Sequence, residues 1–205
     1  MPTEPGYEAR RKQESERKRL RVLQAAGVCF AERGFKKTTM DAVAKRAGVS
    51  KGLVFHFFGH KQAIFSAVIE DGLRQWSTIS EYRASSVEDD PLGELRALFL
   101  ASFDFVEQHP VLILFARDDE GLGQQYRKQV VFCNKRWRDR AQRIFKRGIR
   151  DGVIRDVDAR QVATIFHRTQ VALLTAESRH GAIPHYDRAA IETTLDIFIR
   201  GIQRS

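Results

Sequence analysis

The sequence has few of the features that mark secreted, membrane-spanning or disulfide-stabilised proteins. Its 205 residues include only two cysteines, Cys29 and Cys133, which are too few for a disulfide framework or a cysteine-based zinc site. The longest uninterrupted apolar run, residues 111–116, is far shorter than the roughly 20 residues that span a bilayer. The N-terminal residues contain no apolar segment of the kind found in secretory signal peptides. These absences predict a cytoplasmic protein with no membrane partner.

The sequence also lacks the motifs of common catalytic and cofactor sites. None of the six histidines stands at a metal-binding spacing, and no nucleophile elbow, P-loop or dinucleotide-binding glycine motif occurs. The acidic runs at 88–90 and 118–120 have no apolar surroundings that would raise the pKa of a carboxyl group. We therefore expect no enzymatic activity, no metal ion and no cofactor.

Positive charge is concentrated in the first third of the chain. The net charge is +9, and residues 1–61 contain fourteen Lys and Arg against six Asp and Glu. The rest of the chain is close to neutral, with twenty-one basic and twenty acidic residues. Such asymmetry favours an N-terminal segment that binds an anionic partner and a second segment with another task. The alternative is a solvated basic tail around residues 10–21.

Apolar residues recur at helical spacing along almost the whole chain, and no strand pattern occurs. The first twelve residues contain two prolines and a glycine without an apolar period, and we predict that they form a disordered basic arm. The sequence therefore predicts an all-α protein. Its expected helices cover residues 17–33, 40–47, 51–57, 60–76, 91–108, 111–115, 124–150, 159–179 and 187–203.

Two of the predicted helices are short and are joined by a tight turn. Thr39 and Ser50 are suitable N-caps, and Gly48 supplies the positive φ that the turn between the helices requires. This arrangement, preceded by a longer helix, predicts a helix-turn-helix unit. An ordinary helical hairpin has the same periodicity, but the basic residues in and beside the unit favour DNA binding; these are Lys36, Lys37, Lys45, Arg46, Lys51 and Lys61.

Residues 22–65 resemble the DNA-binding domain of the TetR family of bacterial transcriptional regulators. The resemblance lies in VLQAAGVCFAERGF, in TTMDAVAKRAGVSKG and in HFFGHKQAIF. It implies an N-terminal helix-turn-helix domain over 13–60 and a helical effector-binding and dimerisation domain over 61–205. It also implies a homodimeric repressor that binds an inverted-repeat operator and is released by a small molecule. The alternative is a sequence-nonspecific architectural DNA-binding protein.

The expected DNA contacts lie on and around the second short helix. Its N-terminus offers backbone N–H groups to phosphate, and its N-terminal side chains face the bases when such a helix enters the major groove. Phe55 stands where the family commonly has tyrosine, so this position lacks a phenolic hydroxyl for phosphate. Either Leu53 or Val54 is placed to touch a thymine methyl group. The DNA-contacting residues that we predict are Thr39, Ser50, Lys51, Gly52, Phe55, His56 and Lys61.

In the C-terminal domain the resemblance implies an effector pocket and a dimer interface formed by the last two helices. Aromatic residues on the helices around the family's cavity suit an apolar or aromatic effector, although the same residues could simply fill the core. The predicted pocket residues are Phe99, Phe103, Phe115, Trp137 and His167. Apolar residues on more than one side of a helix indicate a partner helix in addition to the core. The predicted dimer residues are Leu173, Ala176, Ile191, Leu195, Phe198 and Ile202.

The predicted helix over 124–150 is strongly basic, with ten Lys and Arg and a single acidic residue. It could form a second face for nucleic acid or membrane. Residues 70–120 carry the opposite balance, twelve acidic and four basic residues. Because charges of similar size and opposite sign are close in the sequence, we favour pairing of this helix with the acidic segment.

Overall fold

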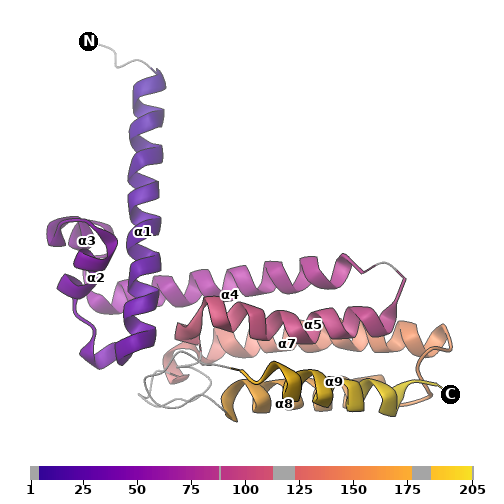
Figure 1. Ribbon diagram of the computed structural model, residues 1–205. Coiled ribbons are helices and arrows are strands. Elements are labelled where there is room, and N and C mark those ends of the chain that lie inside the picture. The colour runs from indigo at the N-terminus through magenta and orange to yellow at the C-terminus, as the bar shows by residue number, and fades with distance from the viewer. Residues whose placement is uncertain (1–4, 88, 113–122, 177–185, 205) are drawn as a thin grey trace. The chain divides into compact units, whose positions relative to one another are not determined.

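The computed structural model describes residues 5–87, 89–112, 123–176 and 186–204 (Figure 1). These residues form eight α-helices and one short 3₁₀ helix, and no strand is assigned within them. The prediction of an all-α fold is thus confirmed. The chain divides into two compact units, residues 1–71 and 72–205. The division lies inside the fourth helix, whereas the boundary predicted from the sequence lies just before that helix.

The helices of the first unit are α1 (Pro5–Lys37), α2 (Met40–Ala47), α3 (Lys51–Phe58) and the first part of α4 (Lys61–Ser85). Phe30 and Phe65 are fully buried, and their rings meet edge to face at a centroid distance of 4.8 Å. Phe35 adds a third ring, 5.0 Å from Phe65. Edge-to-face contact of this kind stabilises aromatic pairs beyond the burial of their area. The three rings fix the C-terminal end of α1 against the start of α4.

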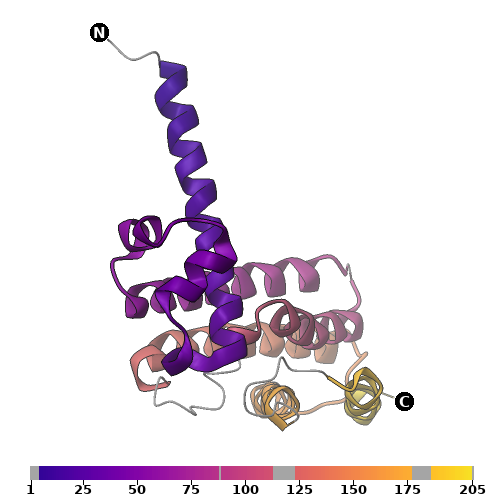
Figure 2. The ribbon, with the colours of Figure 1, turned by 60° about the vertical axis from the view of Figure 1, so that its left-hand side comes forward.

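The first helix begins earlier than the sequence suggested. We predicted disorder for residues 1–12, but α1 begins at Pro5 and extends well beyond α2 and α3 (Figure 2). Proline is compatible with the first turn of a helix, and the Lys, Arg, Glu and Gln residues that follow favour helix without any core. Glu14 and Lys18 form an i, i+4 ion pair at 2.6 Å. The helical conformation is interrupted by a kink at Gly34, which has a φ of 73°, and α1 ends at Lys37.

The second unit contains the remainder of α4 and the helices α5 (Pro91–Gln108), η1 (Pro110–Leu112), α7 (Gly123–Arg150), α8 (Ala159–Ala176) and α9 (Arg188–Ile202). Helix α7 packs against both α5 and α8 (Figure 1). Phe166 of α8 lies at the centre of the core, with ring centroids 4.9 Å from Phe99 and 4.8 Å from Phe198. The aromatic rings from α5, α7, α8 and α9 therefore form one continuous cluster.

The ends of α7 and α9 are joined by a close backbone contact. The amide of Arg155 donates to the carbonyl oxygen of Ile202 at 2.9 Å, and that of Arg204 donates to Val153 at 3.0 Å. Gly148 permits the chain to turn back here, because a Cβ at this position would lie 2.5 Å from the Cδ1 atom of Ile154. None of the described helices is long and apolar enough to cross a membrane.

Candidate functional site

The helix-turn-helix unit has the caps that the sequence predicted. The hydroxyl of Thr39 accepts a hydrogen bond from the amide of Ala42 at 3.2 Å, and that of Ser50 accepts one from Leu53 at the same distance. Gly48 adopts a φ of 64°, and its amide closes the end of α2. These bonds satisfy backbone groups that helix ends otherwise leave unpaired. The predicted start of α2 and of α3 is confirmed.

Helix α3 has one buried side and one exposed side. Val54 is completely buried and Phe58 nearly so, whereas Leu53 is half-buried. Of the two residues considered for contact with a thymine methyl group, Val54 therefore belongs to the core. The small residues Ala44 and Ala47 are buried in the facing helix and allow the two helices to approach closely.

The exposed side of α3 is the surface that could enter a DNA groove. Lys51, Gly52, Phe55 and His56 are all exposed, and their spacing places them on one face. Phe55 is 41% exposed, so part of its ring is available to a binding partner. Apart from its chain neighbours and the nearby backbone of α3, no atom lies within 4 Å of the position that a Cβ of Gly52 would take, so a phosphate or base can reach the backbone there.

The charges around this surface are partly paired within the protein. Lys51 Nζ lies 3.0 Å from the carboxylate of Asp41, and both side chains are largely exposed. An exposed ion pair of this kind contributes little to stability, so Lys51 can exchange its partner for a phosphate at small cost. Lys36, Lys37 and Lys45 are exposed on neighbouring segments and add positive charge.

Lys61 has a structural role that the sequence did not suggest. Its Nζ atom donates to the carbonyl oxygens of Phe35 at 2.9 Å and Lys36 at 3.1 Å. The same ammonium group lies 4.5 Å from the centre of the Phe35 ring. A lysine has three N–H donors, and two of these close the C-terminal end of α1. One donor remains for the DNA phosphate that we predicted as its partner.

We expect Lys61→Ala to destabilise the first unit as well as to weaken DNA binding. Hydrogen bonds from a charged donor each contribute about 1.5–3 kcal/mol, and partial exposure reduces this here. Hydrogen exchange of the full-length protein should show faster exchange of the α1 amides before Lys37. Lys45→Ala, at an exposed position of α2, is the matched control and should leave that exchange unchanged.

The second unit contains an apolar cavity of about 340 Å³ between α4, α5, η1, α7 and α8. Its wall includes Leu73 and Trp76 of α4, Phe105 of α5, and His167 and Gln170 of α8. This volume lies near the lower end of the range of small-molecule sites, and a largely apolar wall with a few polar groups is typical of them. The hydroxyl of Ser102 also lines the cavity and has no hydrogen-bond partner among the described residues.

The structure separates the predicted pocket residues into three groups. His167 lines the large cavity, and Trp137 lines a smaller neighbouring one. Phe99 and Phe103 are packed within the aromatic core and line neither cavity. Phe115 lies outside the described residues. The residues of α4 were missed, because their apolar spacing alone does not distinguish a cavity wall from a packed core.

The comparisons with known proteins agree with this geometry. A family model described as bacterial regulatory proteins of the tetR family matches residues 22–68, the segment from the second half of α1 into α4. The HTH-type transcriptional repressor KstR2 of Mycolicibacterium smegmatis is 30% identical over 162 residues, which cover 77% of this chain and 75% of the relative. The chain belongs to the TetR family. It is therefore a DNA-binding transcriptional regulator and not an enzyme.

Solved structures of TetR regulators have the same fold along nearly the whole chain. The ketosteroid transcriptional regulator KstR2 of Mycobacterium tuberculosis has a TM-score of 0.69 at 26% identity, covering 91% of this chain and 95% of that one. AibR in complex with isovaleryl coenzyme A and operator DNA has a TM-score of 0.66 at 18% identity, covering 88% and 97%. TetR regulators bind operator DNA and dimerise.

Among the described residues that line the cavity of this TetR regulator, His167 has a strongly shifted pKa. Burial, together with the nearby Arg138 and Arg168, lowers the pKa of His167 from 6.5 to about 4. Its ring lies 5.2 Å from the indole of Trp137. At neutral pH the imidazole is thus uncharged and presents a neutral polar group to the cavity.

This shift has a consequence for stability against pH. The unfolded chain binds a proton at His167 below about pH 6.5, whereas the folded chain does so only below about pH 4. Stability therefore falls as the pH is lowered through this window, by about 3 kcal/mol from this group. In denaturant titrations, His167→Gln should show a smaller loss between pH 6.5 and pH 4, and the exposed control His56→Gln should follow the wild type. Identical pH profiles for His167→Gln and wild type would contradict the assignment.

The predicted dimer seam on α9 needs correction. Ile191, Leu195 and Ile202 are buried in the core of their own protomer, and a partner cannot reach them. Periodicity located the apolar stripe of α9 correctly, but the protomer itself covers that stripe. Leu173 and Phe198 are partly buried against the same core, whereas Ala176 is exposed.

A different face of α8 and α9 is available to a partner. Ile165 of α8 is 54% exposed and Ile197 of α9 is 69% exposed. Thr193 and Gly201, one turn of α9 before and after Ile197, are exposed and have small side chains, which permit close approach of another helix, and Arg200 is exposed beside them. The exposed positions of the two helices are Arg160, Gln161, Ile165, Arg168, Ala172 and Ala176 on α8, and Ala189, Ala190, Glu192, Thr193, Ile197, Arg200 and Gly201 on α9.

The basic helix α7 is paired in part with the acidic segment that precedes it. Arg136 pairs with Glu81 of α4, and Arg147 pairs with Glu94 of α5. Glu94 is nearly buried, so its pairing with Arg147 compensates a charge inside the domain. These contacts agree with the pairing that we favoured over a second nucleic-acid face.

Proposed function

We propose that this chain is a homodimeric repressor that leaves its inverted-repeat operator when an apolar or aromatic small molecule occupies the 340 Å³ cavity. The main support for operator binding is the exposed face of α3, with Lys51, Gly52, Phe55 and His56 next to a capped helix N-terminus. In a symmetric dimer two such helices meet two half-sites of a palindromic sequence.

The side chains on and around α3 have different tasks in this proposal. Ser50, Lys51, His56 and the first backbone amides of α3 bind phosphate groups and set the position of the helix. Phe55 contacts a thymine methyl group in the major groove, because an exposed apolar ring can read that group and cannot hydrogen-bond. The remaining predicted contacts, Thr39 at the start of α2 and Lys61 at the start of α4, touch the DNA backbone on either side.

Dimerisation uses the exposed face of α8 and α9 that contains Ile165 and Ile197. These two side chains are the large apolar groups that the last two helices leave exposed among the described residues. The small residues beside Ile197 let a partner helix approach, and the contact is repeated by symmetry, so each substitution acts twice.

The effector proposal is supported by the cavity and by related regulators. KstR2 is described as a ketosteroid transcriptional regulator, and AibR was solved with isovaleryl coenzyme A, a ligand that contains an apolar acyl group. Helix α4 supplies Ile64 and Phe65 to the first unit and Leu73 and Trp76 to the cavity. A ligand that binds more tightly to one position of α4 can therefore shift the equilibrium between the conformation that binds the operator and the conformation that does not. A coupling free energy of about 1–3 kcal/mol is typical of such regulation.

Selection from random double-stranded DNA tests the operator proposal directly. The wild type should recover an inverted repeat and should retain it against excess unrelated DNA at moderate salt. Lys51→Ala should lower the slope of log affinity against log salt by about one unit, since one phosphate contact is lost. Lys146→Ala, at an exposed position of α7, should keep the wild-type slope. Equal competition by unrelated DNA would favour the architectural alternative.

A further inference from the structure

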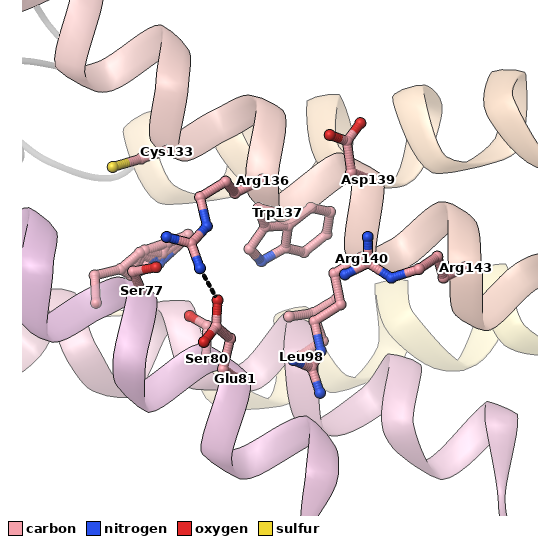
Figure 3. Close-up of a pocket in the computed structure, with 11 residues that line it drawn as sticks. Ser77, Ser80, Glu81, Leu98, Cys133, Arg136, Trp137, Asp139, Arg140 and Arg143 are labelled. Carbon is pink, nitrogen blue, oxygen red and sulfur yellow. Dashed lines mark hydrogen bonds and ion pairs between the residues drawn. The ribbon is translucent and has the colours of Figure 1, made fainter.

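A second, smaller cavity of about 140 Å³ lies beside the large one and has a different chemical character. It is formed by α4, α5 and α7, and its wall includes three arginines (Figure 3). Trp76 and Cys133 line both cavities, so the two spaces adjoin. Ser80, Glu81, Trp137 and Arg140 converge on the smaller space.

Three buried polar atoms of this wall are unpaired. Ser80 Oγ, Trp137 Nε1 and Arg140 Nε have no hydrogen-bond partner within the part of the chain that the structure describes. Buried polar atoms are nearly always paired, and three orphans around one small cavity therefore call for a common explanation. The indole and guanidinium groups are donors only, and the hydroxyl can donate as well. The missing partner is an acceptor.

The hydrogen bonding of Ser80 differs from that of Ser66 and Thr78, two other hydroxyl residues of α4. Ser66 donates to the carbonyl oxygen of Gln62 at 3.0 Å, and Thr78 donates to that of Arg74 at 3.2 Å. This bond to the preceding turn is the usual solution for a hydroxyl inside a helix. Ser80 is 6% exposed and makes no such bond among the described residues, and it lines the cavity instead.

The wall of the small cavity carries more positive than negative side chains. Glu81 is paired with Arg136, and Asp139 is held by Lys135 at 2.6 Å, so both carboxylates in the wall have a cationic partner. Arg140 and Arg143 remain as further cations on the wall. Burial is the main cause that lowers the pKa of the Arg140 guanidinium; Arg143 acts in the same direction, and Glu81 and Glu94 act against it.

We infer that the small cavity binds an oxyanion, the carboxylate or phosphate head of an effector whose apolar body lies in the 340 Å³ cavity. Ser80 and Trp137 donate neutral hydrogen bonds to the oxygens, and Arg140 donates a charge-assisted one. This inference rests on the proposed effector function and narrows it to amphiphilic acids. A neutral ligand would bring no negative charge to Arg140, whereas an oxyanion brings one together with several acceptor oxygens for these donors.

Binding of a matched set of probes tests this inference on the full-length protein. The probes are octanoate, octyl phosphate and octanol, which share one alkyl chain and differ in the head group. The chain has two tryptophans, Trp76 and Trp137, and both line the small cavity, so intrinsic fluorescence reports on this site. Octanoate or octyl phosphate should bind at least about tenfold more tightly than octanol, and their order shows which oxyanion is preferred.

Substitutions in the wall separate the head-group contacts from the apolar ones. Arg140→Gln should weaken binding of the preferred oxyanion by about tenfold or more, and Ser80→Ala and Trp137→Phe by smaller factors, measured by calorimetry. Octanol affinity should be unchanged in all three. The controls are Lys146→Gln on α7 and Thr78→Ala on α4, which should bind every probe as the wild type does.

The possible outcomes are distinct. The inference is wrong if octanol binds as tightly as both anions, or if neither anion binds up to its solubility limit. It is also wrong if Ser80→Ala and Arg140→Gln, shown by melting to be folded, bind the anions normally. If the anion binds at this site but does not release the operator, the anion site stands and the effector proposal fails.

Discussion

Ile197→Asp should convert the protein from dimer to monomer and should abolish tight operator binding. Ile197 is 69% exposed in the protomer, so the substitution leaves the protomer core intact. At the proposed interface it places an unpaired charge in an apolar contact, and it does so twice by symmetry. A buried unpaired charge costs about 3–5 kcal/mol, so the dimer dissociation constant should rise by about a hundredfold or more. Sedimentation velocity and operator titration measure the two effects.

The matched control for this substitution is Val131→Asp. Val131 is an apolar residue of α7 with 57% exposure, and it lies outside the proposed interface. The Val131→Asp substitution introduces the same charge at a similarly exposed apolar position. It should leave the dimer dissociation constant and the operator affinity unchanged. A wild-type dimer in the Ile197→Asp protein at micromolar concentration would exclude this face of α9 from the interface.

Phe166→Ala should have the largest effect on stability. The Phe166 ring is fully buried and contacts four other rings, those of Phe99, Trp137, Phe145 and Phe198. Truncation of a buried phenylalanine to alanine commonly costs about 3–5 kcal/mol, because the cavity that remains cannot fully collapse. For a chain of this size such a loss corresponds to a fall in Tm of about 10 °C.

Phe132→Ala provides the comparison for Phe166→Ala. Phe132 is 59% exposed on α7, and removal of its ring should change the unfolding free energy by less than about 0.5 kcal/mol. Denaturant titration monitored by far-UV circular dichroism gives the unfolding free energy of both variants. Both lose a phenyl ring, but only Phe166→Ala loses contacts within the core. A similar effect of the two substitutions would contradict the central position of Phe166.

Local features of the fold could be predicted from the sequence because they depend on a few neighbouring residues. The caps at Thr39 and Ser50 each involve a side chain and an amide three residues away. The left-handed turn at Gly48 is equally local. The first twelve residues show the limit of this reasoning, because Pro5 and Gly6 suggested disorder while the charged residues that follow support a helix.

Faces of helices could be predicted, but the neighbour that covers each face could not. The stripe with Ile191, Leu195 and Ile202 was located correctly and assigned to a second protomer, whereas the protomer's own core covers it. Phe99, Phe103 and His167 lie on similar apolar stripes, and His167 alone of the three lines a cavity. Spacing along one helix contains no information on how closely the next helix approaches.

The sequence by itself determined the helical fold, the helix-turn-helix unit and its exposed basic surface, since periodicity, capping residues and charge act over a few turns of one chain. Only the tertiary structure decided which apolar residues fill the core, where the two cavities lie, and that Lys61 closes the end of α1. The unpaired donors at Ser80 and Trp137 belong to this second group. Whether a polar atom is satisfied depends on partners brought together from distant helices, and packing alone determines those distances.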